Sequence, residues 1–124
     1  MLRRLVRRST SRSDVPVEDR PSKGRPIDLV HLARQTLGDR ELEREILQLM
    51  ACQVESCDAR IDLATAAERR SLAHAIKGAA RNVGAFALGD AAEAVEEEPA
   101  DDGRLPAMKA ELRRAGSFIR TLLG

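Results

Sequence analysis

The residues best suited to chemistry lie in the stretch AHAIKGAARNVGA, residues 73–85. His74 is followed three positions later by Lys77, and Gly78 comes next. Residues three or four apart share one face of a helix, so these residues would lie together. An imidazole acts as a nucleophile or a base near neutral pH, and a lysine ammonium can hold a phosphoryl group. A glycine inside a helix costs about 1 kcal/mol relative to alanine, which indicates that another surface must come close here.

A helical wheel separates two faces of this segment. At about 100° per residue, Lys77, Gly78 and Arg81 fall on the same side as His74. The opposite side holds Arg69 and an apolar set, namely Leu72, Ile76, Ala79 and Val83. We therefore expect the apolar set to face the core and the imidazole to face solvent. By position, the face that would contact a partner also includes Arg70, Ser71, Arg81, Asn82 and Ala85.

Hydrophobic periodicity predicts five helices that position this face. Asp39 is a good N-cap, Thr65 and Glu68 have the spacing of a capping box, and Gly84 breaks the helix that carries His74. The expected spans are about 28–37, 39–61, 65–83, 85–98, and from 105 onward. In the second helix the apolar positions with helical spacing are Leu42, Ile46, Leu49, Met50, Val54, Cys57 and Ile61.

These helices, joined by short connections and without strand-like alternation, predict an all-α fold. We expect an antiparallel four-helix bundle, with the short additional N-terminal helix packed across one end. The chain is 43% hydrophobic but only 2% aromatic, so its core must be built from aliphatic side chains, which favours helices. One feature opposes the pattern: the run Glu96-Glu97-Glu98 places negative charge at the C-terminal end of the fourth helix, against its dipole.

Charge divides the chain into two parts. Residues 1–26 are rich in arginine, serine and proline and carry a net positive charge, whereas the remainder is mildly acidic. We expect 1–26 to be a flexible basic tail and 27–124 to be the helical domain. The sequence contains no membrane span and no secretory signal, and Cys52 and Cys57 would point in different directions on one helix. These observations favour a reduced, cytoplasmic setting, and no recognisable spacing of histidines and cysteines predicts a metal site.

The pattern around His74 extends well beyond three residues. His-x-x-Lys-Gly is followed by two small residues, an apolar-Gly-small triplet and a leucine, here His74, Lys77, Gly78, Ala79, Ala80, Val83, Gly84, Ala85 and Leu88. The chain continues with Ala91-Ala92-x-x-Val95-Glu96, and upstream it carries Ile27-Asp28-Leu29 and Gly38-Asp39. Over roughly residues 27–122 it resembles the histidine-containing phosphotransfer (HPt) domain family of two-component phosphorelays.

The resemblance implies specific roles. His74 would accept a phosphoryl group from the aspartyl phosphate of a receiver domain and pass it to another receiver. Lys77 would offset the phosphoryl charge, and Gly78 would leave room for the receiver. The chain would be a carrier without kinase or phosphatase activity of its own, and it would need no cofactor because Mg²⁺ belongs to the partner.

The partners implied are the receiver domains of a hybrid histidine kinase and of a response regulator. We expect a monomer that binds no nucleic acid. A second function stays open from the sequence: a helical binding or scaffold module for a signalling protein that is not phosphorylated.

Overall fold

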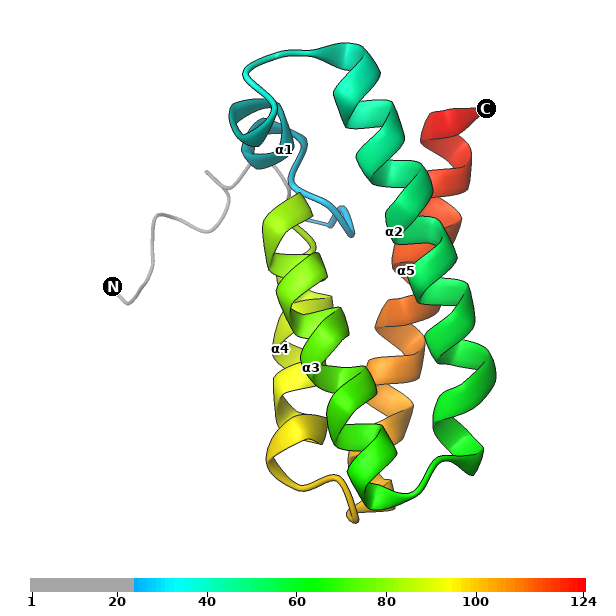
Figure 1. The fold of residues 1–124 in the computed structure, drawn as a ribbon. Helices are drawn as coiled ribbons and strands as arrows, with labels where there is room; N and C mark the ends of the chain where they lie inside the picture. The colour runs from blue at the N-terminus through cyan, green and yellow to red at the C-terminus, as the bar shows by residue number, and fades with distance from the viewer. Residues whose placement is uncertain (1–23) are drawn as a thin grey trace, which may run out of the picture.

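The computed structural model describes residues 24–124, and these residues form an antiparallel four-helix bundle capped by a short helix (Figure 1). The prediction of a flexible tail falls largely on residues 1–23, which lie outside the described part. The elements in chain order are α1 (Leu29–Gln35), α2 (Arg40–Arg60), the 3-10 turn η2 (Ile61–Leu63), α3 (Ala66–Val83), α4 (Phe86–Glu97), the 3-10 turn η3 (Asp102–Arg104) and α5 (Leu105–Leu123). The all-α prediction is confirmed.

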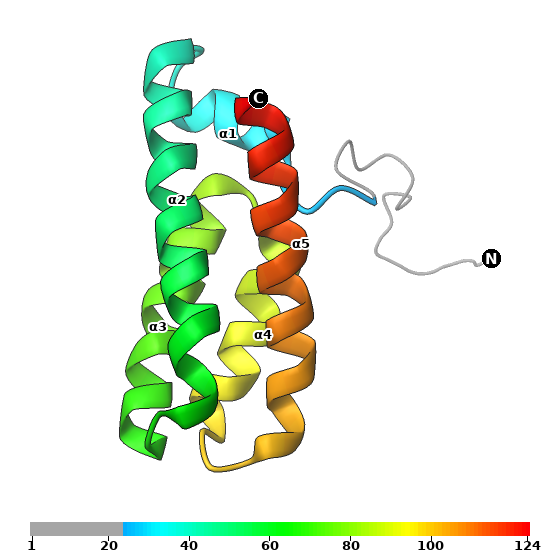
Figure 2. The same ribbon diagram turned by 90° about the vertical axis from the view of Figure 1, so that its right-hand side faces the viewer.

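The helices form a ring in which α3 contacts α2 and α4, and α5 contacts the same two from the opposite corner. Figure 2 shows α1 lying across the end of the bundle at which α5 finishes. Within residues 24–124, no helix combines the length and the hydrophobicity that crossing a bilayer requires.

Local signals in the sequence set where the helices begin. Asp39 caps α2 by accepting a hydrogen bond from the backbone N–H of Leu42. Thr65 and Glu68 form the capping box that opens α3, at 2.9 and 3.1 Å. Both caps satisfy backbone N–H groups that lack a partner within the helix, so the predicted starts are confirmed.

Aliphatic side chains fill the core, as the composition predicts. The largest fully buried residues are Ile27, Leu32, Met50, Ile61, Leu88, Met108, Leu112 and Ile119. In α2 not every apolar position with helical spacing faces the core, because Leu42 and Leu49 are 40% and 65% exposed while Leu47, outside that set, is buried. The spacing of the leucines in α2 is compatible with burial of either of two adjacent helix faces. Contact with α5 determines which face is buried.

The core face of α3 is also rotated relative to the predicted face. The residues that are buried are Ala73, Ile76, Ala80 and Val83, whereas Leu72 and Ala79 are only partly buried. The cause is the extensive contact with α4, which draws the small residues of α3 inward. The wheel gave weight to the larger apolar side chains and so missed this rotation.

Arg69, which the wheel placed on the apolar side, is indeed largely buried, with 11% of its side chain exposed. Its guanidinium donates to the backbone carbonyls of Ile61, Asp62 and Pro99 and pairs with Asp102 at 2.6 Å. A buried cation is tolerated here because carbonyls and a carboxylate surround it. Arg69 thereby joins the α2–α3 connection to the α4–α5 connection.

Arg104 offsets part of the negative charge at the C-terminal end of α4. Arg104 donates to the carbonyl of Ala94 at 2.8 Å and lies 3.8 Å from the carboxylate of Glu97. A cation on the last carbonyls of a helix satisfies acceptors and favours the dipole. Arg104, from the following turn, therefore offsets part of the unfavourable charge predicted for Glu96-Glu97-Glu98.

Gly84 ends α3 in the left-handed conformation, with φ of 91°. Its carbonyl accepts from the backbone N–H of Asp28 at 2.9 Å, so the segment entering α1 crosses the turn between α3 and α4. A Cβ at this position would lie 2.8 Å from the carbonyl oxygen of Asp28. Both the backbone angle and the close crossing therefore require glycine.

We expect Gly84→Ala to destabilise the protein by about 2 kcal/mol or more, because it adds a backbone clash to left-handed strain. Gly38→Ala is the matched control: Gly38 also has a positive φ, of 81°, but an added Cβ would meet nothing within 4 Å. It should cost only about 1 kcal/mol. Urea unfolding measures both, and equal losses would show that the crossing contributes nothing.

Candidate functional site

The exposed face of α3 carries the residues that the sequence singled out. The His74 side chain is 69% exposed, and Arg70, Ser71 and Asn82 are exposed beside it. Gly78 is exposed as well, and a Cβ built on it would meet no atom within 4 Å. The glycine therefore serves no close contact inside the described chain, and the surface next to the imidazole is open.

The imidazole is held on one side by a carboxylate from α4. His74 Nδ1 lies 2.8 Å from Oε2 of Glu96, whose side chain is 21% exposed. An ionised carboxylate can only accept, so Nδ1 carries the hydrogen and donates it. In the neutral ring Nε2 then keeps its lone pair, and within residues 24–124 it has no hydrogen-bond partner except solvent.

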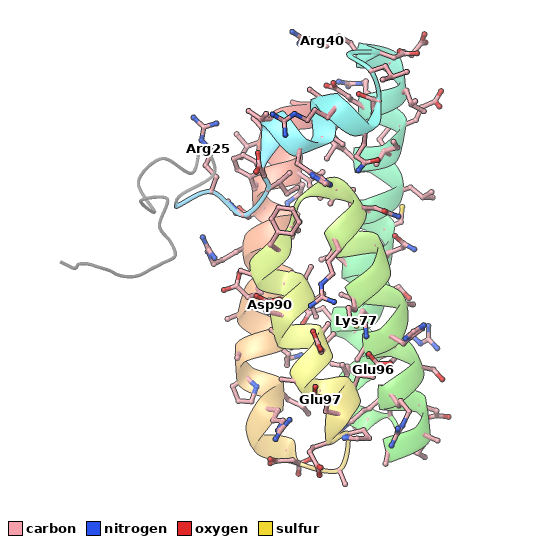
Figure 3. The ribbon with its side chains drawn as sticks, turned by 90° about the vertical axis from the view of Figure 1, so that its left-hand side faces the viewer. Arg25, Arg40, Lys77, Asp90, Glu96 and Glu97 are labelled. Carbon is pink, nitrogen blue, oxygen red and sulfur yellow. The ribbon has the colours of Figure 1, made fainter. Side chains whose placement is uncertain are left out.

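Lys77 completes this cluster from the next turn of α3. Its ammonium lies 2.6 Å from Oε1 of Glu96, and both residues are labelled in Figure 3. The two carboxylate oxygens are therefore divided between the lysine and the histidine. The close ion pair with Lys77, followed by the hydrogen bond from His74, holds the pKa of the Glu96 carboxyl below its ordinary value. The carboxylate therefore stays ionised at neutral pH and accepts from both α3 side chains.

Arg81 lies two turns along α3 from His74 and also reaches across to α4. It pairs with Glu93 at 2.5 Å and with Asp90 at 3.1 Å. The hydrogen bond from Arg81 lowers the pKa of Glu93, and the two carboxylates raise the pKa of Arg81. Arg81, one of the residues predicted to contact a partner, is therefore already paired with carboxylates of its own chain, and 40% of its side chain is exposed.

Ala85 does not lie on this face, so its prediction as a contact residue was wrong. It is fully buried, and its N–H donates to the carbonyl of Ala80 at 2.8 Å. The wheel extended the helix beyond Val83, but Gly84 turns the chain and sends Ala85 into the core as the N-cap of α4.

Glu96 is the site residue that the sequence analysis did not single out. It was noted as a family-like position and as part of an acidic helix end, but not as a partner of His74. The turn at Gly84 contained the signal. In an antiparallel helical hairpin, residues at similar distances before and after the turn face each other, and His74 and Glu96 are such a pair.

The geometry describes a solvent-facing imidazole whose ring is oriented by a carboxylate, with a cation nearby and open space over Gly78. Within residues 24–124, no three histidine, cysteine, aspartate or glutamate side chains gather as a metal site would require. A family model described as Hpt domain matches residues 41–118, which span α2 to most of α5. The chain belongs to the Hpt-domain family.

Hpt domains serve histidine phosphotransfer in phosphorelays and interact with receiver domains of kinases and response regulators. They are phosphoryl carriers rather than enzymes. Searches of curated proteins and of solved structures found no match. The family match supports the resemblance read from the residues around His74, and α1 lies outside the matched range.

The contacts of Glu96 with Lys77 and His74 should depend on pH. Because its pKa is lowered in the folded protein, the link between α3 and α4 is complete above the ordinary pKa of a glutamate and breaks as the pH falls through the lowered value. Carbon NMR of the Glu96 carboxyl should show a titration midpoint below the ordinary glutamate value. Lys77→Ala should raise that midpoint, whereas Arg70→Ala, which removes a cation that does not pair with Glu96, should leave it unchanged. A midpoint that Lys77→Ala leaves in place would contradict the assignment.

Proposed function

We propose that this Hpt domain carries a phosphoryl group on Nε2 of His74 between the aspartates of two receiver domains. The observation that supports this most directly is the 2.8 Å hydrogen bond from Nδ1 to Glu96 on a ring that is 69% exposed. One nitrogen is thereby occupied as a donor, and the other presents its lone pair to an incoming partner.

The transfer step follows from this arrangement. The Nε2 lone pair attacks the phosphorus of the partner's aspartyl phosphate, a nitrogen–phosphorus bond forms, and the bond to the aspartate oxygen breaks. The aspartate leaves as a carboxylate. The ring gains positive charge as it reacts, and the Nδ1–H bond to the Glu96 carboxylate stabilises that charge. The reverse step, with a second receiver's aspartate as the nucleophile, releases the phosphoryl group.

Lys77 supplies the positive charge near the transferred group. Its ammonium is one helical turn from His74 and only 24% of its side chain is exposed, so its position is restricted. A phosphoryl group adds two negative charges or nearly so at neutral pH. We expect the ammonium to be shared between Glu96 and the phosphoryl oxygens, which reduces repulsion between these anions.

Catalytic Mg²⁺ and the aspartate belong to the receiver in this proposal, and the Hpt domain contributes the acceptor and its surroundings. Gly78 supports this division, because it leaves the helix surface beside the imidazole without a side chain. The edge of another domain can therefore come down onto α3 far enough to align phosphorus with Nε2.

His74→Gln should abolish acceptance of label from a receiver domain of a hybrid histidine kinase that carries a ³²P-labelled aspartyl phosphate. His31, the other histidine of the chain, provides the matched control, and His31→Gln should accept label at the wild-type rate. The label should be stable in alkali and lost in acid, as expected of phosphohistidine. Labelling of His74→Gln at the wild-type rate would exclude the proposal, and receiver binding without transfer would favour a scaffold role.

Gly78→Trp should keep the fold but slow transfer by at least about tenfold, because the indole would hold the receiver away from the imidazole. Tryptophan is a better helix former than glycine, and within the described chain a Cβ at this exposed position meets nothing within 4 Å. Ala110→Trp is the control, since Ala110 is exposed on α5 at the opposite corner of the bundle. Circular dichroism checks the fold, and equal transfer rates for Gly78→Trp and Ala110→Trp would remove the steric role of the glycine.

A further inference from the structure

The seam between α3 and α4 has a regular register. His74 on α3 faces Glu96 on α4, and seven residues further along α3 the side chain of Arg81 lies against Gly89, seven residues back along α4. Between these two levels, three residues forward from His74 is Lys77 and three residues back from Glu96 is Glu93. On antiparallel helices these steps match, so Lys77 is level with Glu93.

Lys77 nevertheless pairs with Glu96, which lies one turn away from the level of Lys77, and not with Glu93. Its ammonium is 2.6 Å from Glu96, one turn closer to the imidazole, while Glu93 accepts from Arg81 at 2.5 Å. Lys77 also contributes to the lowered pKa of Glu93, which places the two groups within electrostatic reach. Glu93 is thus a second carboxylate available to Lys77, and Arg81 occupies it.

The position of Arg81 depends on a missing side chain in α4. A Cβ on Gly89 would lie 2.9 Å from Cγ and 3.1 Å from Nε of Arg81. The arginine stem therefore lies flat against the α4 backbone at Gly89, and its guanidinium extends to Glu93 and Asp90. A single guanidinium nitrogen, Nη2, donates to both carboxylates, and two charged partners restrict the guanidinium more than either one alone.

We propose that Arg81 is a positioning residue for the phosphorylation site, which acts by occupying Glu93 so that Lys77 turns toward Glu96 and His74. The proposal rests on the phosphotransfer function proposed above and assigns a role to a residue two turns from the imidazole. Without Arg81, the ionised Glu93 is level with Lys77 and captures it. The ammonium then moves about one helical pitch, roughly 5 Å, away from the phosphoryl group.

The first experiment measures Lys77 without any phosphorylation. In Arg81→Ala, the NMR titration midpoint of the Glu96 carboxyl should rise toward the value found in Lys77→Ala, because the ammonium has left. In the double variant Arg81→Ala/Glu93→Gln the midpoint should return to the wild-type value, since a neutral amide does not hold the ammonium. Asp90→Asn is the control: it removes one partner of Arg81 but leaves Glu93 occupied, and the midpoint should not move.

The second experiment measures the consequence for phosphohistidine. Potassium phosphoramidate, which transfers its phosphoryl group to imidazole with release of ammonia, loads His74 without a partner protein. The half-life of the phosphohistidine, followed by ³¹P NMR, should shorten about threefold in Arg81→Ala, a change of the size that an exposed ion pair supports. Lys77→Ala should show a similar loss, and Arg81→Ala/Glu93→Gln should regain the wild-type half-life.

The rescue separates positioning from a structural role. Neutralising Glu93 in Arg81→Ala cannot rebuild the ion pair between Arg81 and Glu93, so a role limited to that ion pair predicts no recovery of the phosphohistidine half-life. Thermal unfolding of each variant records the structural loss separately. An unchanged Glu96 midpoint in Arg81→Ala, or failure of Glu93→Gln to restore either quantity, overturns the proposal. A wild-type chain that takes no phosphoryl group at His74 refutes the proposed function instead, and the carboxyl titrations still decide where Lys77 binds.

Discussion

The close packing of α3 against α4 is the constraint on which the site depends. Small residues face inward on both helices, with Ala73 and Ala80 on one and Gly89 and Ala92 on the other, all of them buried. Small side chains let two helix backbones approach, and the turn at Gly84 then sets their register. This register brings Glu96 to His74 and allows polar side chains of modest length to meet across the seam. Figure 3 shows Lys77 and Glu96 on the two neighbouring helices. The chemistry of the site is therefore a property of a helix pair.

Much of the fold could be predicted because its signals are local. The N-cap at Asp39, the capping box at Thr65 and the glycine at Gly84 determine where helices begin and end through their own backbone and nearest neighbours. Exposure of His74 could likewise be predicted, since one helix wheel is enough to show that it lies opposite the apolar stripe. The family pattern around His74 strengthens the same conclusion, and the Hpt-domain match agrees with it.

The features that could not be predicted depend on a second helix. Which leucine stripe of α2 is buried is decided by α5, so Leu47 and Leu49 could not be distinguished from the sequence of α2 alone. Ala85 was assigned to the exposed face because a helical wheel assumes that the helix continues, whereas the chain turns at Gly84. The carboxylate partners of His74 and Lys77 lie about twenty residues away in the sequence, and those of Arg81 about ten. Their identity follows from the register of the α3–α4 hairpin. A prediction that folded α3 and α4 as a pair would have found Glu96.

The single free nitrogen of His74 has a consequence for traffic through the protein. If the phosphoryl group is received and released at Nε2 beside Gly78, donor and acceptor domains must bind the same surface, because Glu96 occupies the Nδ1 side of the ring. The two receiver domains then compete for one binding surface, and the phosphorylated protein has to dissociate from the donor before it binds the acceptor. The overall rate of transfer then depends on how quickly each complex dissociates, so weak, short-lived complexes suit this carrier better than tight ones.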